Sequence, residues 1–272
     1  MMPESPRSPS FSNPPIHETV LGIQFAPIAG LTSGLLGWYW KSLPGMEWTR
    51  THDAVYVPDQ YETFPDRSHG FIPDITSIFQ SGSTRLQILS ASEDRVIQAQ
   101  KSRFLYNWRK ASAVPYPGFA AIHGEFARLY EGFQQFVGEA GLGTLQPNQW
   151  EVNYVNRIHM GDFWRNAKEW TRILPGLFPT AIINDVDLVF EGPSGEFCFE
   201  IRPGRGRLRI AVRLDRNSVG EEPEFLLLSL TARGPLAPDQ DPRDGFTVGH
   251  RAIVDAFVKI CSPEALSWWG KQ

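Results

Sequence analysis

The most constraining feature of the sequence is the strict alternation of apolar and charged side chains between residues 196 and 215. A period of two is typical of β-strands that bury one face and expose the other. A Pro-Gly-Arg-Gly sequence at 203–206 divides the stretch and predicts a hairpin turn. The apolar positions are Phe197, Phe199, Ile201, Leu208, Ile210, Val212 and Leu214. The segment therefore predicts an antiparallel sheet with one apolar face and one charged face.

Periodicity, caps and turn residues predict further strands and helices on both sides of this hairpin. In the first half, we predict strands at 16–25, 54–57, 84–91, 95–99 and 104–110, and helices at 31–43 and 119–136. In the second half, we predict strands at 150–158, 181–191, 196–202, 207–215 and 224–232, a helix from Asp162 to Pro175, a helix through 253–260, and a short last helix capped by Ser262. Each half reads strand, helix, four strands, helix.

This order predicts an α+β fold with a mainly antiparallel sheet, helices on one face, and a tandem duplication of the strand-helix-four-strands-helix unit. We expect residues 1–15 to be a disordered Pro/Ser-rich tail. Residues 16–141 and 149–272 are then the two α+β halves, together forming one compact domain. The topology resembles that of the TATA-box binding protein. Since one fold hosts many functions, the analogy does not predict DNA binding.

Charge and composition exclude several classes of protein. The chain has 26 basic and 30 acidic side chains and a net charge of -4, whereas surfaces that bind phosphate backbones are strongly positive. Its longest apolar runs are a few residues, too short to span a membrane, and its N-terminus lacks the apolar core of a secretory signal. The two cysteines, Cys198 and Cys261, cannot form a disulfide scaffold or a zinc finger. We therefore expect a cytoplasmic protein.

The sequence carries no recognisable motif for a metal or a cofactor. None of the six histidines has another histidine four residues away or a cysteine at metal-ligand spacing. A Walker loop, a dinucleotide fingerprint and a Gly-x-Ser-x-Gly elbow are all absent from the sequence. We therefore expect no cofactor and no metal.

Several short segments together carry a family resemblance. They are Asn13-Pro14-Pro15-Ile16, Arg103-Phe104-Leu105-Tyr106-Asn107-Trp108-Arg109-Lys110, Tyr116-Pro117, Glu151-Val152-Asn153-Tyr154-Val155-Asn156, the stretch 250–257 and Trp269-Gly270. In combination, they resemble a sporadically distributed bacterial family of uncharacterised proteins of about this length. The resemblance implies a bacterial protein and assigns no activity or functional residue.

The charged face of the 196–215 hairpin supplies the candidate binding residues. With 203–206 as the turn, Arg202 would face Arg207, and Glu200 would face Arg209. Side chains of the preceding strand would add carboxylates beside them. The candidates for ligand or partner binding are Asp185, Asp187, Glu200, Arg202, Arg205, Arg207 and Arg209. Arginine forks on such a face suit carboxylate or phosphate groups.

Three functions remain open. The leading hypothesis is a soluble bacterial binding or interaction protein that uses this open charged face to bind a protein or a small polar ligand, with no membrane role. The alternatives are a nucleic-acid-binding protein that uses the Arg-rich hairpin, and an enzyme with an unrecognised polar site. Asp187 and Glu200 also form a candidate acid/base pair, but carboxylates flanked by arginines are more typical of ion-pair networks. Binding is therefore favoured over catalysis.

Alternation also predicts which side chains the interior receives. Phe104, Tyr106 and Trp108 lie on one side of their strand, and we expect them to pack under the long helix rather than to stack nucleobases. Asn153 and Asn156 have opposite parity, so we expect one of them to be buried and hydrogen-bonded.

Overall fold

The computed structural model describes residues 9–64, 84–111, 114–161, 164–177, 192–215, 224–237 and 240–272. Its elements are β1 (Ile16–Phe25), α1 (Ser33–Ser42), β2 (Trp48–Val55), β3 (Thr84–Ser90), β4 (Arg95–Gln100), β5 (Arg103–Arg109), α3 (Phe119–Glu139), β6 (Pro147–His159), the 3-10 helix η1 (Ala167–Arg172), β7 (Ser194–Ile201), β8 (Gly206–Asp215), β9 (Phe225–Pro235), α4 (Pro242–Ile260) and α5 (Pro263–Trp268). The predicted α+β class is confirmed.

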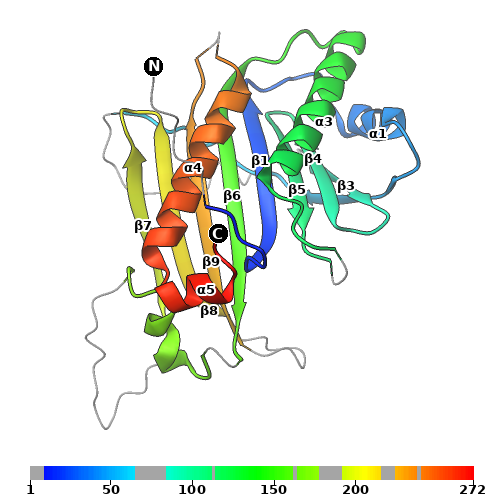
Figure 1. Ribbon diagram of the computed structural model, residues 1–272. Coiled ribbons are helices and arrows are strands. Elements are labelled where there is room, and N and C mark those ends of the chain that lie inside the picture. Colours follow the sequence, from blue (N-terminus) through cyan, green and yellow to red (C-terminus); the bar gives the residue numbers. More distant parts are fainter. Residues whose placement is uncertain are drawn as a thin grey trace, which may run out of the picture.

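All described strands join one antiparallel sheet of nine strands, in the order β2-β3-β4-β5-β1-β6-β9-β8-β7. Helices α3 and α4 lie across the same face of this sheet, α3 over the half that contains β5 and α4 over β6, β9 and β8 (Figure 1). The two halves meet where β1 pairs with β6. The apolar core fills the space between the helices and the sheet.

The element boundaries follow local signals closely where a strand or helix buries one face. Strand β1 has the predicted bounds, and α1 begins after Thr32, whose hydroxyl accepts a hydrogen bond from the Leu35 N–H at 3.4 Å. Strand β2 begins at Trp48, well before the predicted 54–57. Most of its residues are exposed or half-buried on both faces, so the strand lacks the alternation that would reveal it.

The predicted helix from Asp162 to Pro175 is shorter than expected. Its described part contains the 3-10 helix η1, and both Trp170 and Leu174 are buried. Asp162, Phe163 and the predicted strand at 181–191 lie outside the described residues.

The aromatic side chains of β5 pack under α3, as predicted. Phe104, Tyr106 and Trp108 are buried, and the Phe104 ring stacks on Phe133 of α3 with 4.9 Å between centroids. Of the two asparagines of β6, Asn156 is the buried one, and its Nδ2 donates to the Leu228 carbonyl at 3.1 Å. Both predictions are confirmed.

Part of the predicted disordered tail is folded against the C-terminus. The Ser12 N–H donates to the Gly270 carbonyl at 3.1 Å, and the Gln272 N–H donates to the Ser10 carbonyl at 2.9 Å. Phe11 meets Phe257 of α4 edge to face, with ring centroids 5.6 Å apart. One aromatic ring in a polar stretch is enough to anchor it on the core, so the prediction of disorder does not hold for residues 10–13.

A segment without helix or strand, residues 56–64, follows β2 and crosses the face of the sheet that the helices leave uncovered. We call this segment the strap. No helix in the described parts of the chain is long and apolar enough to cross a lipid bilayer.

Candidate functional site

The sheet face opposite the helices is lined with polar side chains, and we call it the polar face. Alternation puts them there, because their strand neighbours, such as Ile23, Phe104 and Trp150, point into the core. Its central members are Gln24, Gln98, Gln100, Arg103, Asn107, Gln149, Glu151, Arg207, Arg209 and Arg233. Most of them are buried or half-buried, so the face is a hydrogen-bonded layer rather than a fully solvated surface.

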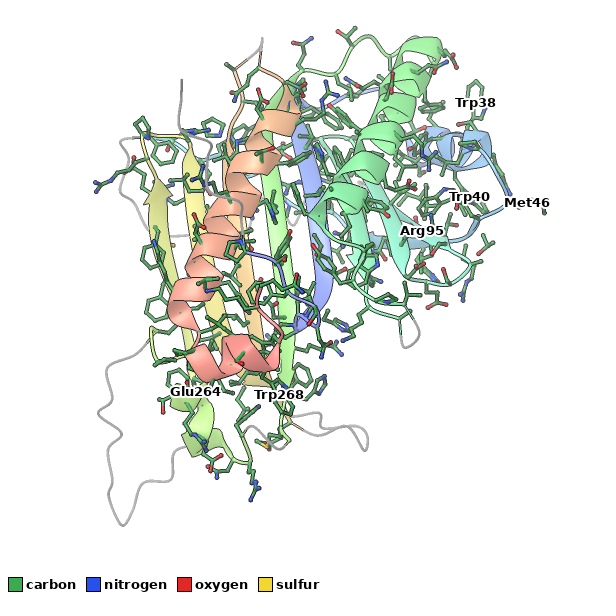
Figure 2. The ribbon with its side chains drawn as sticks, in the orientation of Figure 1. Trp38, Trp40, Met46, Arg95, Glu264 and Trp268 are labelled. Carbon is green, nitrogen blue, oxygen red and sulfur yellow. The ribbon has the colours of Figure 1, made fainter. Side chains whose placement is uncertain are left out.

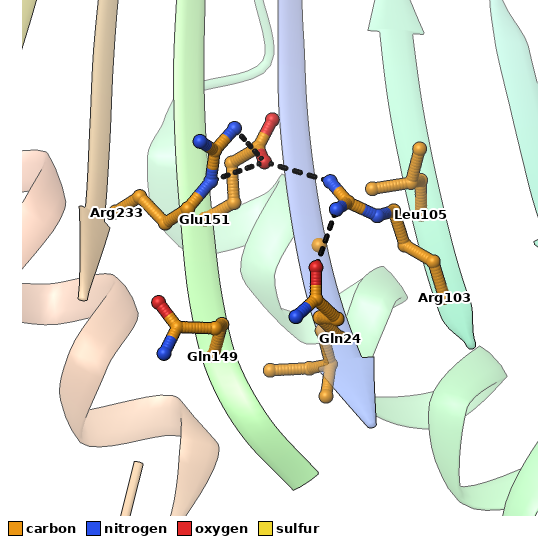
Figure 3. A pocket seen from close by; sticks show the side chains of 8 residues that line it. Gln24, Arg103, Leu105, Gln149, Glu151 and Arg233 are labelled. Atoms are coloured by element: carbon orange, nitrogen blue, oxygen red, sulfur yellow. Dashed lines mark hydrogen bonds and ion pairs between the residues drawn. The ribbon is translucent and has the colours of Figure 1, made fainter. Parts of the chain in front are cut away.

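At the centre of the polar face, Glu151 of β6 lies between two arginines (Figure 3). Its Oε2 accepts from Arg103 Nη1 at 3.2 Å and from Arg233 Nη2 at 2.6 Å, and Arg103 Nη2 also donates to Gln24 Oε1 at 2.6 Å. Burial raises the pKa of the Glu151 carboxyl, but Arg233 and Arg103 outweigh it and hold that pKa below its ordinary value. The space between these side chains leaves no room for a water molecule, so this cluster is packed ion pairing and not a ligand cavity.

A second carboxylate, Glu62, reaches the polar face from the strap. It pairs with Arg207 Nη1 at 2.5 Å and with Arg209 Nη1, and Arg233 Nη1 lies 3.9 Å away. Only 2% of the Glu62 side chain is exposed, against 11% for Arg207 and 27% for Arg209. Burial lowers the pKa of Arg209, whereas the hydrogen bond and charge of Glu62 raise it and prevail, so this guanidinium stays charged.

Side chains of the sheet also form hydrogen bonds with the backbone of the strap. Gln100 binds Val57 on both sides: its Oε1 accepts from the Val57 N–H at 3.0 Å, and its Nε2 donates to the Val57 carbonyl at 2.8 Å. The Gln60 N–H donates to Gln24 Oε1 at 2.8 Å. Further contacts are the Glu62 N–H with Gln149 Oε1 at 3.1 Å and Arg103 Nη2 with the Pro58 carbonyl at 3.2 Å. The polar face therefore holds an extended chain segment by its main chain.

The end of the strap rests on the β7–β8 turn. The Arg207 guanidinium lies over the Phe64 ring, 4.8 Å from its centroid, and the Phe64 side chain also approaches Gly204 in the turn. The strap thus covers the polar face from β4 to β8. The charged face of the hairpin is therefore covered in part: Glu62 pairs with Arg207 and Arg209, whereas Glu200, Arg202 and Arg205 are exposed.

The predicted register of the hairpin is wrong: the turn begins one residue earlier than predicted, so the cross-strand partner of each residue differs by two positions. Ile201 pairs with Gly206, so Glu200 faces Arg207 and Cys198 faces Arg209. Residues 202–205 form the turn, and the expected strand pair between Arg202 and Arg207 does not form. The shift keeps the parity of both strands, so the charged side chains still share the predicted face.

The remaining candidate residues have separate positions. Arg202 and Arg205 are exposed in the turn, and Glu200 is exposed with its Oε1 accepting from the Gly204 N–H at 3.1 Å. Asp185 and Asp187 lie outside the described residues, so the candidate acid/base pair of Asp187 with Glu200 does too. Cys198 is exposed on the polar face, where it pairs with Arg209 across the hairpin, and partial burial raises the pKa of its thiol. A thiol of this kind is not activated as a nucleophile.

Sequence reasoning missed four charged residues at the centre of the site, as well as its glutamines and Asn107. Glu151 and Arg233 alternate with buried residues of β6 and β9, and Arg103 with those of β5, so the rule that placed the hairpin arginines would have found all three. Glu62 gave no such signal, since a single glutamate in a turn-rich stretch has no periodicity.

A hydrogen-bonded chain on the helix side also went unpredicted. Tyr116 donates to Tyr154 across 3.3 Å, and the Tyr154 hydroxyl lies 2.8 Å from His250 Nδ1. The His250 ring stacks on Phe119 with 3.9 Å between centroids. Burial lowers the pKa of His250 to about 4 and raises that of Tyr154 well above its ordinary value, so both groups are neutral near pH 7. All of these residues except Phe119 come from the segments that carry the family resemblance.

Other exposed features lie away from the polar face. Arg95 pairs with Glu47 at 2.9 Å and Glu125 at 3.7 Å beside α3 (Figure 2). Large exposed apolar side chains include Trp38 on α1, Met46 after it and Trp268 on α5 (Figure 2). No cluster of three or more metal-binding side chains occurs among the residues that the structure describes.

Comparison with known proteins identifies no family for the chain. No protein-family model matches it, and no curated protein matches it. Among solved structures, it is similar to DynU16, a protein of the dynemicin biosynthetic locus, with 12% sequence identity over 89% of this chain and 95% of that chain, at a TM-score of 0.25. At this TM-score, the similarity carries no conclusion about fold or function.

Proposed function

We propose that this chain is a cytoplasmic binding or interaction protein that recognises its partner on the polar face, at the β8–β9 arginines and the β7–β8 turn. One observation carries the proposal: Arg207, Arg209 and Arg233 all lie within 3.9 Å of the carboxylate of Glu62, which belongs to the strap. Guanidinium groups bind carboxylates through charge-assisted hydrogen bonds that fix orientation as well as position.

The exposed arginines of the turn extend this surface beyond the strap. Arg202 and Arg205 flank Gly204, which lies against Phe64 at the end of the strap. They add positive charge at a rim that solvent reaches. A partner with carboxylate or similar anionic groups therefore suits the site better than a neutral one.

The nucleic-acid hypothesis has less support from the same geometry. Each central arginine of the polar face is already matched by Glu62 or Glu151, and a phosphate-binding surface needs arginines whose charge is not compensated. The described residues of this face also give an enzymatic role less support, because partial burial raises the pKa of the Cys198 thiol and so does not activate it as a nucleophile.

The proposal is tested by capture with tagged full-length protein from extracts of its native cells. Arg202→Gln/Arg205→Gln should recover at least about tenfold less of the bound partner than the wild type, because arginines at interfaces are frequent hot spots. Its melting temperature should not change, since exposed arginines contribute little to stability. Arg251→Gln, on the exposed side of α4, is the matched control and should recover as much as the wild type. Equal recovery by all three proteins would contradict the proposal.

We also propose that the chain is a tandem duplication with a topology like that of the TATA-box binding protein. The strand order supports this: outward from the centre it reads β1-β5-β4-β3-β2 on one side and β6-β9-β8-β7 on the other. Each half also has one long helix, α3 or α4, and the two helices lie on the same face of the sheet (Figure 1). The predicted counterpart of β2, at 181–191, lies outside the described residues. We draw no activity from this likeness.

A further inference from the structure

The strap is bound in the way that a peptide ligand is bound. Between Val57 and Phe64, it crosses from β4 to β8, which is five strand spacings or roughly 24 Å. Seven residue steps reach at most about 25 Å when fully extended. The segment is therefore extended, and it runs across the strands rather than along them.

Its contacts divide into two kinds. Gln100, Gln24 and Gln149 bind backbone N–H or carbonyl groups, so they accept any extended chain whatever its side chains. Side chains beneath the strap also bind two of its carboxylates: Arg207 and Arg209 pair with Glu62, and the Ser102 hydroxyl donates to Asp59 Oδ1. Peptide-binding proteins commonly use both kinds of contact: main-chain hydrogen bonds supply affinity, and a few side-chain sites supply specificity.

The strap itself contributes little to the core. None of its residues belongs to the apolar core cluster, and Tyr61 and Thr63 are exposed. Segments held mainly by polar contacts at a surface open at lower free-energy cost than core strands, without global unfolding. We therefore expect local opening of the strap to cost less free energy than unfolding of the sheet beneath it.

We infer that the strap is a built-in occupant of a peptide-binding face, and that the external partner is an extended peptide segment bearing a carboxylate, which takes over the same contacts. This inference rests on the proposed binding function and names its partner class. A tethered occupant competes at an effective concentration of roughly millimolar, so the apparent affinity for the external segment falls in proportion to the fraction of molecules whose strap is released.

The test uses a fluorescent peptide with the strap sequence, Tyr56 to Phe64, and fluorescence anisotropy. The full-length variant Gln60→Pro/Glu62→Lys loses the N–H that binds Gln24 and presents a positive charge to the arginines, so its own strap is released. Tyr61→Lys is the control, because it also places a lysine in the strap but on an exposed side chain that does not face the arginines. We expect the released variant to bind the peptide at least about 30-fold more tightly than the wild type or the control.

Two further probes define what the face recognises. A peptide with glutamine in place of the glutamate that corresponds to Glu62 should bind the released variant at least about tenfold more weakly, since it lacks the negative charge that pairs with the arginines. A single-stranded oligonucleotide of similar length should bind more weakly than the strap peptide. Tighter binding of the oligonucleotide, equal binding of the glutamine peptide, or no peptide binding by a released variant that melts cooperatively would each overturn the inference.

Hydrogen exchange in the wild-type protein provides a measurement that does not depend on a variant. The amides of Gln60 and Glu62 should exchange at least about 100-fold faster than those of β1 and β6, because local opening costs less than unfolding. Exchange of the strap amides only at the rate of β1 and β6 would show that the strap never leaves, and would overturn the inference. If peptide binding fails while Arg202→Gln/Arg205→Gln still loses its captured partner, the peptide inference alone is overturned; unchanged capture would instead contradict the proposed function.

Discussion

The imidazole of His250 illustrates how burial selects a protonation state at a single residue. Phe119 covers one face of the ring, and the Tyr154 hydroxyl lies 2.8 Å from Nδ1. Burial lowers the pKa to about 4, while Asp255 acts weakly in the opposite direction. The folded protein therefore keeps His250 neutral at pH values where the unfolded chain, with a histidine pKa of about 6.5, takes up a proton.

This difference predicts a pH-dependent stability. Above about pH 6.5, neither state binds the proton; as the pH falls towards 4, only the unfolded state does, so the folded state loses stability. Between pH 7 and pH 5, the loss from His250 should be about 2 kcal/mol. We expect His250→Phe, which keeps the ring stacking, to be less sensitive to pH by that amount in urea unfolding at the two pH values. Identical pH dependence in the two proteins would contradict the assignment, since His17 and His123 titrate in both.

Helix α4 approaches the sheet closely because glycine replaces larger residues at its contact with Trp150. The Trp150 side chain is almost fully buried. A Cβ added at Gly245 would lie 2.3 Å from Trp150 Cδ1, and one added at Gly249 would lie 2.6 Å from Trp150 Cζ3. These glycines lower the helix propensity of α4, and the packing of the indole ring against the helix offsets that loss.

The contact predicts opposite effects for two glycine-to-alanine substitutions. Gly132→Ala, on the exposed side of α3 where an added Cβ meets no atom within 4 Å, should stabilise the protein by about 0.5–1 kcal/mol through helix propensity. Gly245→Ala should destabilise it by about 1–3 kcal/mol, because Trp150 has no space into which to move. Denaturant unfolding of both variants measures the difference. Stabilisation by Gly245→Ala would mean that α4 lies further from the sheet.

The hairpin of β7 and β8 shows that strands can be predicted from the sequence although the register between them cannot. The alternation in 196–215 correctly indicated two strands and their apolar faces, because periodicity is a local property. The register of the two strands is not a local property, since it depends on which four residues form the turn between them. The turn uses 202–205 rather than 203–206, which places Glu200 opposite Arg207 instead of Arg209.

The two halves of the whole molecule are joined by more than the connection at 140–146. Strand β1 pairs with β6 from Ile16 to Phe25, and α3 meets α4 through Phe126 and Phe246, whose ring centroids are 4.9 Å apart. The strap adds Glu62 of the first half to arginines of the second. These contacts make one continuous core and sheet.

Cleavage between the halves should therefore leave them associated. A protease site inserted between Gly143 and Thr144, both exposed, permits cutting after folding. We expect the two fragments to elute together from a size-exclusion column at the position of the intact chain, because separation would expose the central strands and the core. The uncut insertion protein is the control. Fragments that elute separately would show that the β1–β6 pairing does not hold the halves together.

The sequence by itself determined the strands and helices that bury one face and the parity of the polar face, because Arg207, Arg209 and Phe104 obey a period set by the backbone of their own strand. It did not determine the extent of β2, which lacks such a period. Only the tertiary structure decided which charges meet. Glu62 is 145 residues from Arg207, and no periodicity links a loop residue to a strand on the far side of the sheet. That pairing depends on where β2 ends and on how far the extended strap reaches from that point. Both positions are set only when the whole sheet has formed.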